Sequence, residues 1–502
     1  MAQNFQHPFQ CIHFVKKKNG ETRNVLVASA GAKLFSYAAE SGQRLSSWPQ
    51  DGADMAIPDV NGAGSNPETE GPPGKKRKVD PAEAKKDGDA SAKKTPAWTS
   101  IPILTSTPDG EYLLALTGED KCIRVFQIEE DGSFHQLSER PMPKRPSAIT
   151  FMENNDILTG DKFGDVYSMP LLTSTEPRAA PKTPAQRSTA IAATNLTVHT
   201  ERNLKSLEMQ IKMKSKQQEQ KKESEKPVFD HDLLLGHVSL LTDVAFASLP
   251  SPDPSSTKRR NYILSADKDE HIRVSRGRPQ AHVIEAQCFG HKAFVSRLCV
   301  PEWAPELLIS GGGDPHLFVW NWAAGELLHT VALVQQEQGS EAEGKPKEIA
   351  VRGIWAATLG ADSQRIILVA LEGNPTLLPF TLHPNGSMTP HTPIETSGNI
   401  LDIEVHASTV LVSVDCIRTP GSTQEWRSAT STTLLETFQL KQGTTEWESV
   451  ADQMIGTINA TGTVSLSLTE GAEEKEKEAL NGVLYGLENL RKHGWAGEAT
   501  VF

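Results

Sequence analysis

The sequence predicts an all-β fold, a closed ring of seven four-stranded sheets with two long disordered insertions and a short C-terminal helix. Short apolar strands rich in Val, Ile, Leu and Phe recur along the 502 residues, and long helical patterns are rare. One group of motifs occurs twice in succession, and weaker copies of it fill the chain. We therefore expect a single β-propeller over residues 1–470, followed by a helical tail over residues 471–502.

The clearest repeat lies in the middle of the chain. Residues 236–242 can be laid over residues 290–296 at an offset of 54, and residues 263–269 over residues 308–314 at an offset of 45. The difference falls in a Pro- and Ser-rich loop, where an insertion between strands is expected. Each copy has a Gly-His pair, two apolar strands of which the second ends in Ser, an Asp four residues later, and a third strand. This order and spacing are typical of WD40 repeats.

By resemblance to other WD repeats, a few side chains of each copy would form a buried hydrogen-bonded set. They are His237, Ser265 and Asp269 in the first copy, with Ser275 where Trp is usual, and His291, Ser310, Asp314 and Trp320 in the second. One such unit cannot bury both of its faces, so it has to stack with similar units into a closed ring. Weaker copies at residues 25–37, 107–126, 145–167, 366–380 and 400–416 bring the number to seven, although six or eight blades are compatible with the sequence.

Two segments differ from the rest in composition. Residues 49–95 consist largely of Gly, Pro, Ala, Asp and Lys, and residues 173–226 begin with Pro, Thr and Ala and end in Lys, Gln and Glu. Neither segment can bury enough apolar surface to offset the entropy of ordering, so we expect disordered loops. The first contains a basic run, Lys75, Lys76, Arg77 and Lys78, that resembles a nuclear import signal and predicts a nuclear protein. A solvated charge run is the alternative.

The C-terminal segment has a helical pattern over residues 473–493. Its apolar stripe consists of Leu480, Val483, Leu484, Leu487 and Leu490, with acidic residues early and basic residues late. Packing of this stripe against the propeller is the first interpretation, and a partner-binding helix is the second.

Composition and motifs argue against several classes of function. The net charge of −12 and the pI of about 5.7 do not suit a free-standing nucleic-acid binder, and no apolar run reaches the ~18 residues of a membrane span. The five cysteines form no CxxC pair, so no metal site is expected. A His–Ser–Asp set that occurs twice at one repeat position indicates structural bonds rather than a hydrolase triad. With no P-loop and no dinucleotide fingerprint, we expect no cofactor and no catalysis by this chain.

Four segments resemble a known family. Residues 159–167, 233–244, 265–275 and 289–296 are similar to the non-catalytic WD-repeat subunit of the eukaryotic tRNA (guanine-N7)-methyltransferase. The resemblance implies a seven-bladed propeller that stabilises a separate catalytic subunit, as a 1:1 heterodimer. That partner would bind S-adenosylmethionine and form N7-methylguanosine in the variable loop of tRNA, and the propeller would meet tRNA mainly through the complex.

If one blade faces this partner, our choice is the turn that carries Lys268, His271 and Arg273. Arg273 falls between Ile272 and Val274, so a strand that packs those two residues inward would direct the arginine outward. A basic residue there could pair with an acidic helix of the methyltransferase. A solvent-facing charge without a partner is the alternative.

Two other functions stay open from the sequence. A WD-repeat adaptor for ubiquitin ligase or ribosome assembly would use the same scaffold, but the Trp-Asp-x-Arg signature of many adaptor receptors is absent, because Trp320 is followed by Asn321. An enzyme that acts alone ranks third.

Overall fold

The computed structural model describes residues 4–16, 24–50, 96–172, 229–251, 258–333, 348–360, 363–428, 431–467 and 473–492. Nearly all of the two expected loops, and with them the basic run Lys75 to Lys78, lie outside these ranges. In the described part of the chain, no helix is long and apolar enough to cross a membrane.

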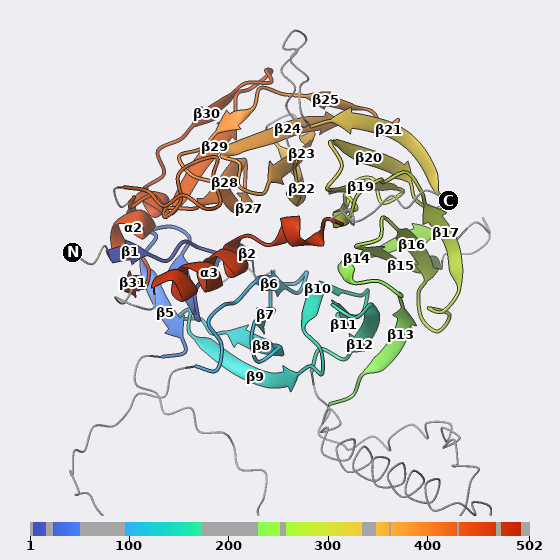
Figure 1. Ribbon diagram of the computed structural model, residues 1–502, viewed down its shortest axis with the longest axis horizontal. Coiled ribbons are helices and arrows are strands. Elements are labelled where there is room, and N and C mark those ends of the chain that lie inside the picture. The colour runs from blue at the N-terminus through green and yellow to red at the C-terminus, as the bar shows by residue number, and fades with distance from the viewer. Residues whose placement is uncertain are drawn as a thin grey trace, which may run out of the picture.

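Seven antiparallel sheets surround a central axis, which confirms the predicted seven-bladed propeller (Figure 1). Blades 1 to 3 are β2 (Cys11–Val15), β3 (Val25–Ala30), β4 (Lys33–Ala38) and β5 (Arg44–Trp48); β6 (Ile103–Ser106), β7 (Tyr112–Thr117), β8 (Cys122–Ile128) and β9 (Phe134–Pro141); and β10 (Pro146–Phe151), β11 (Ile157–Asp161), β12 (Asp165–Met169) and β13 (Asp232–Gly236). Each blade uses consecutive strands of the chain.

The remaining blades follow the same plan. Blades 4 and 5 are β14 (Leu241–Pro250), β15 (Arg259–Asp267), β16 (Ile272–Arg276) and β17 (Ile284–Cys288), and β18 (Val295–Cys299), β19 (Leu307–Gly312), β20 (His316–Asn321) and β21 (Glu326–Ala332). Blade 6 is β22 (Val351–Leu359), β23 (Gln364–Leu371), β24 (Thr376–Leu382) and β25 (Met388–Pro390), with β26 (Ile394–Glu395) also paired to β24; blade 7 is β27 (Ile400–His406), β28 (Thr409–Val414), β29 (Leu435–Leu440) and β30 (Trp447–Ser449).

The strands differ in burial according to their place in a blade. Second strands such as β3 and β19 are buried along their whole length because neighbouring blades cover both faces, so they read as continuous apolar runs. Outer strands such as β21 are mostly exposed. The blades approach so closely that a Cβ added at Gly160 would lie 2.1 Å from Leu241 of the next blade, and one at Gly311 would lie 2.9 Å from Val351. Only glycine fits these two joints without a shift of the neighbour.

The ring closes without a shared strand. Between blades 4 and 5, Asp243 Oδ2 accepts a hydrogen bond from the backbone amide of Leu298, and between blades 7 and 1 Asp402 Oδ2 accepts one from Ile12. The closing joint is therefore built like an internal joint. Beside it, β1 (Asn4–Gln6) pairs with β31 (Ser465–Ser467), and apolar residues of both chain ends share one core cluster.

The C-terminal segment differs in part from the expectation. A short helix that the sequence analysis missed, α2 (Gln453–Thr461), follows blade 7, and the helix predicted over residues 473–493 ends earlier, as α3 (Glu473–Leu484). The carboxylate of Glu372 accepts the backbone N–H groups of Gly486, Leu487 and Glu488, which breaks the helix before η1 (Leu487–Leu490). Leu480 and Leu484 are buried against the propeller, and the tail crosses the centre of one face (Figure 1).

Candidate functional site

Blade 5 contains a closed network of buried side chains. His291 Nδ1 lies 2.7 Å from Asp314 Oδ2, and His291 Nε2 lies 2.8 Å from Ser310 Oγ. A carboxylate only accepts, so neutral His291 carries its proton on Nδ1, and Ser310 donates to Nε2. The indole N–H of Trp320 donates to Ser310 Oγ at 2.8 Å. Each of the four side chains therefore has a partner.

Blade 4 repeats this network with one bond fewer. His237 Nδ1 lies 3.0 Å from Asp267 Oδ2, and His237 Nε2 lies 2.7 Å from Ser265 Oγ. Asp267 Oδ1 accepts the backbone N–H groups of Asp269 and His271. Burial alone would raise the pKa of Asp267, but the hydrogen bonds from His237 and from the turn outweigh it, and the pKa is lowered.

The carboxylate predicted for blade 4 was the wrong one. Asp267, not Asp269, bonds the histidine, and the Asp269 side chain is 43% exposed on the outside of the turn. In blade 5 the position that corresponds to Asp267 is Gly312, where an added Cβ would lie 1.8 Å from the carbonyl oxygen of Phe294. Glycine is required there, so Asp314, two residues later, supplies the carboxylate. A constant offset between the copies hides this shift.

Neither network can serve as a hydrolytic triad. The two histidine side chains are 0% exposed, and Ser265 and Ser310 are also 0% exposed. A nucleophile has to reach its substrate, and both hydroxyls lie inside a packed blade. The two sets hold strands and turns together.

The three residues predicted to bind a partner lie on the turn that Asp267 organises. The side chain of Lys268 is partly exposed, and that of His271 is exposed with Nδ1 3.3 Å from Asp267 Oδ1. Arg273 lies between two fully buried residues of β16, as the alternation predicted, and its guanidinium donates to the carbonyl oxygen of Gly236 at 2.9 Å. Hydrogen bonds of Asp267 and Arg273 thus hold the backbone of the turn in place, and its basic side chains are at the surface.

Exposed apolar side chains that the sequence analysis missed surround this turn. Val238 is fully exposed, Phe289 is 65% exposed, and the Phe289 ring lies 6.5 Å from the His271 ring. Both lie in the connections that carry the Gly-His pairs, and no signal in the sequence distinguishes them from apolar residues that pack inward. A hollow in the same surface is lined by Val238, Ser239, Asp267, Asp269, His271, Arg273 and Gln287. We call Val238, Lys268, His271, Arg273 and Phe289 the fourth-blade surface.

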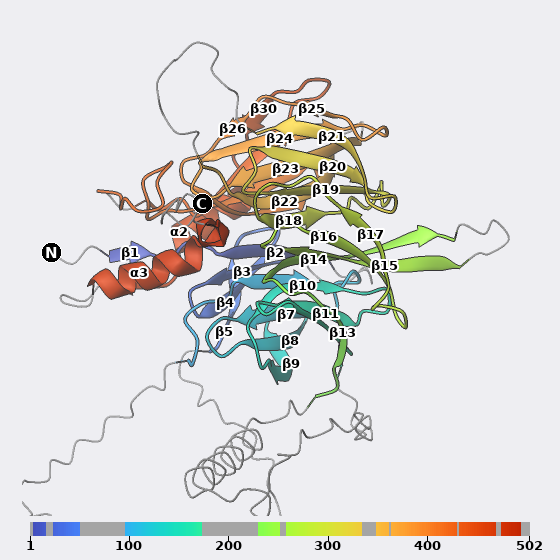
Figure 2. The same ribbon diagram turned by 45° about the vertical axis from the view of Figure 1, so that its right-hand side comes forward.

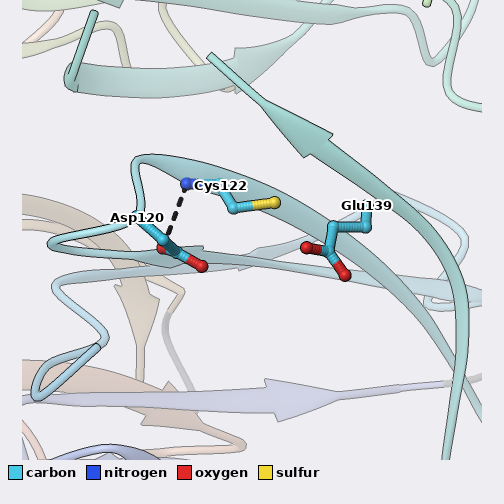
Figure 3. A group of neighbouring side chains, drawn as sticks. All are labelled: Asp120, Cys122 and Glu139. Atoms are coloured by element: carbon cyan, nitrogen blue, oxygen red, sulfur yellow. Dashed lines mark hydrogen bonds between the residues drawn. The ribbon is translucent and has the colours of Figure 1, made fainter. Parts of the chain in front are cut away.

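A cluster of possible metal ligands in blade 2 has a different explanation. Ligand atoms of Asp120, Cys122 and Glu139 lie within 4.8 Å of one another (Figure 3). The guanidinium of Arg124 lies 2.8 Å from Asp120 and 3.2 Å from Glu139, and it stacks over the Trp98 ring. Burial raises the pKa of Cys122 to about 12, so the thiol stays protonated. Arg124 already supplies the positive charge that a metal ion would bring.

Comparisons with known proteins agree with the resemblance. The family described as "tRNA methyltransferase TRM82 WD40 domain" matches residues 26–438. A relative from Aspergillus oryzae, named "tRNA (guanine-N(7)-)-methyltransferase non-catalytic subunit trm82", is 49% identical over 98% of this chain and 99% of its own length. A relative of the same name from Coccidioides immitis is 42% identical over 95% and 96%.

Similarity to a solved structure supports the fold alone. The crystal structure of RRP9 WD40 repeats matches with a TM-score of 0.50 at 11% identity, covering 88% of this chain and 100% of that chain. Both relatives are named as the non-catalytic subunit of the methyltransferase, which agrees with a chain that is not itself the enzyme. The chain therefore belongs to the TRM82 family, the non-catalytic WD40 subunits of tRNA (guanine-N7)-methyltransferase.

Proposed function

We propose that this chain binds and stabilises the catalytic subunit that methylates N7 of a guanosine in the variable loop of tRNA. The observation that carries the proposal is the fourth-blade surface. It combines exposed apolar and basic side chains around a turn whose backbone is hydrogen-bonded to the buried Asp267. The relatives' name as a non-catalytic subunit supplies the kind of partner.

The fourth-blade surface has the composition of a protein interface. Exposed aromatic and aliphatic side chains such as Phe289 and Val238 gain most from burial against a partner. Charges of both signs lie around them, because Asp269 and Arg273 line the same hollow and Lys268 precedes Asp269 in the turn. A surface of mixed sign suits a folded partner whose own charges complement it.

We assign the guanidinium of Arg273 as the group of this chain that binds a carboxylate of the partner. One of its N–H groups is bonded to Gly236, which fixes the orientation of the planar fork. Arg273 also lines the hollow beside Val238. A carboxylate on a helix of the catalytic subunit would complete this site through charge-assisted hydrogen bonds.

Charge reversal tests this docking site. We expect Arg273→Glu and Lys268→Glu each to weaken co-purification with the catalytic subunit at least ~10-fold, as loss of a desolvated charge pair costs about 2 kcal/mol or more. The matched control is Arg365→Glu, an exposed residue near the start of β23 in blade 6. Tm of the isolated propeller should stay within about 2 °C for each variant. Full complex formation by both blade 4 variants would falsify this site.

The methyl donor and the stoichiometry follow from the same proposal. S-adenosylmethionine would be held by the catalytic subunit, and one propeller would bind one catalytic subunit. tRNA would be bound mainly through the complex, in line with the acidic net charge of −12 of this chain. Native mass spectrometry of the purified complex should give a 1:1 heterodimer, and a 2:2 assembly would contradict this part.

We also propose that the complex acts in the nucleus. The support is the run Lys75, Lys76, Arg77 and Lys78, which resembles an import signal. Replacement of all four by Gln should shift a fluorescent fusion of the full chain from the nucleus to the cytoplasm. An unchanged nuclear signal would overturn the role of this run.

A further inference from the structure

A second charged surface lies on blade 3, next to the fourth-blade surface. Lys144 and Arg145 precede β10, and Lys162 follows β11 in the turn to β12. The backbone amide of Lys162 donates to the carbonyl oxygen of Arg145, so the two segments are held side by side. We call Lys144, Arg145 and Lys162 the third-blade cluster.

Among the described residues these three cations have no ion-pair partner, although the charge of Lys144 acts on the carboxylate of Asp161. The carboxylate beside them, Asp161, is buried, and its Oδ1 accepts the turn amides of Phe163 and Asp165. Burial and the charge of Arg145 lower the pKa of Lys162, so the two cations repel one another. Convergence of like charges is a cost in the free protein that a bound anion would remove.

An aromatic ring completes the surface. Phe163, in the turn after Lys162, is 61% exposed, and the Lys144 ammonium lies 4.0 Å from the centre of its ring. Exposed aromatic rings beside cations are the elements by which proteins hold single-stranded nucleic acid, because bases stack on the ring and the cations meet the phosphates.

The third-blade cluster lies next to the fourth-blade surface and beside the cavity under the C-terminal tail, with Lys144, Lys162 and Phe163 exposed. The amide of His237 donates to the carbonyl oxygen of Gly164, which places the Phe163 turn against the connection that carries Val238. Arg145 and Lys162 line the cavity that the C-terminal tail covers. A partner on the fourth-blade surface would thus leave the cluster at the edge of the complex, open to a bound polymer.

The fourth-blade surface and the third-blade cluster differ in the balance of their positive and negative charges. The fourth-blade turn mixes cations with Asp269 and Glu270, whereas no cation of the third-blade cluster is ion-paired with a carboxylate of the described residues. A site where three cations gather around one buried carboxylate has a net positive charge, and on a chain with a net charge of −12 it fits a polyanion better than a folded protein. We propose that Lys144, Arg145 and Lys162 bind backbone phosphates of the RNA held by the methyltransferase complex, and that Phe163 stacks on an unpaired base. This inference rests on the proposed function.

The test uses the complex reconstituted from the full chain and the catalytic subunit, with an unmodified tRNA transcript as probe. For Arg145→Gln/Lys162→Gln, we expect the Kd for tRNA, measured by fluorescence anisotropy, to rise about 10-fold near 0.1 M salt. The slope of log K against log salt should fall by about 1 for each phosphate that the variant no longer neutralises. The matched control is Arg260→Gln/Arg365→Gln, two exposed cations near the starts of β15 and β23, whereas Lys162 follows the end of β11. The β14–β15 hairpin extends away from the side of the propeller where α3 lies (Figure 2).

A second variant addresses the aromatic ring. Phe163→Leu keeps an apolar side chain but removes the stacking face, so it should weaken tRNA binding about 10-fold while capture of the catalytic subunit is unchanged. Lys144→Gln should behave in the same way, with a smaller change in Kd.

Each outcome decides the inference. Weaker tRNA binding and a smaller salt slope, with an intact heterodimer, would support it. An unchanged Kd and slope would overturn it, and loss of the heterodimer in Arg145→Gln/Lys162→Gln would assign the cluster to the protein interface instead. Failure of the wild-type chain to capture the catalytic subunit would overturn the proposed function first, and this inference with it.

Discussion

Blades 4 and 5 share one hydrogen-bond plan and differ in how they complete it. In blade 5 the indole of Trp320 reaches Ser310, and every member of the network is enclosed. In blade 4 the third strand has Ser275 at the matching position, where it is buried and has no hydrogen-bond partner among the described residues, so Ser265 bonds to His237 but accepts no second bond of the kind that Trp320 donates to Ser310. Blade 5 therefore has the complete network, and blade 4 lacks the bond between its third strand and the serine.

The outer sides of the two turns differ as well. The blade 4 turn keeps its network carboxylate on the strand end, at Asp267, and has Lys268, Asp269 and His271 available outside. The blade 5 turn is formed by glycines and uses Asp314 inward. One repeat can therefore keep its scaffold bonds and still present a functional surface, provided that the inward carboxylate comes early in the turn.

Removal of the two histidines should give the largest effect. His291→Ala leaves the buried Asp314 without its charge-assisted bond and Ser310 without an acceptor, so we expect a loss of about 3–4 kcal/mol in the free energy of unfolding. His237→Ala should cost less, about 2 kcal/mol: Asp267 and Asp314 each keep two backbone N–H donors, but only the His291 ring also packs against the rings of Phe318 and Trp320. Urea unfolding followed by tryptophan fluorescence measures both. Equal losses would contradict the difference between the blades.

Replacement of the two blade 4 carboxylates tests the corrected assignment. Asp267→Asn should cost about 2 kcal/mol at pH 7, and Asp269→Asn less than about 0.5 kcal/mol, since only the first is buried and bonded to His237. The pKa of Asp267 is lowered in the folded state, so its contribution is present above the unfolded pKa of about 3.9 and is lost as the pH falls below it. The gap between wild type and Asp267→Asn should therefore narrow below about pH 4, and a gap that widens there would sink the assignment.

The third strands provide a smaller contrast. Trp320→Phe keeps the aromatic packing but removes the N–H donor to Ser310, at a cost of about 1 kcal/mol. Ser275→Ala removes a buried hydroxyl that has no hydrogen-bond partner in the described part of the chain, so it should leave stability unchanged or raise it by up to about 1 kcal/mol. Destabilisation by Ser275→Ala would show that this hydroxyl has a partner after all. Thermal unfolding of both variants beside wild type distinguishes the signs.

The tail contact with blade 4 should matter least. Lys492 lies 3.2 Å from Asp269 and 3.0 Å from Glu270, and its side chain is 55% exposed. Exposed ion pairs of this kind contribute about 0–1 kcal/mol, so Lys492→Gln should change the free energy of unfolding by less than about 0.5 kcal/mol. A change above about 2 kcal/mol would mean that the tail holds the blade 4 turn in place.

Much of this architecture could be predicted because the same sequence pattern occurs several times along the chain. Seven strand–turn patterns predicted seven blades, and the Gly-His pairs located the inner histidines. The position of Asp267 could not be found by a fixed offset, because Gly312 has no side chain and moves the carboxylate of blade 5 by two residues.

Other features depend on contacts between distant parts of the chain. The C-terminal helix ends where the carboxylate of Glu372 in blade 6 accepts hydrogen bonds from the backbone N–H groups after Leu484. The apolar periodicity of the tail gives no information about this contact with a distant residue. Exposure of Val238 and Phe289 is likewise decided by the packing around two connections. Apolar residues in a turn of the sequence do not by themselves indicate that their side chains are exposed.

The most direct test of blade 4 as the docking site is hydrogen–deuterium exchange of the chain with and without the catalytic subunit. We expect slower exchange at the amides of residues 237–241 and 267–273 in the complex, with residues 400–416 of blade 7 unchanged. Protection on blade 7, with none on blade 4, would contradict the account.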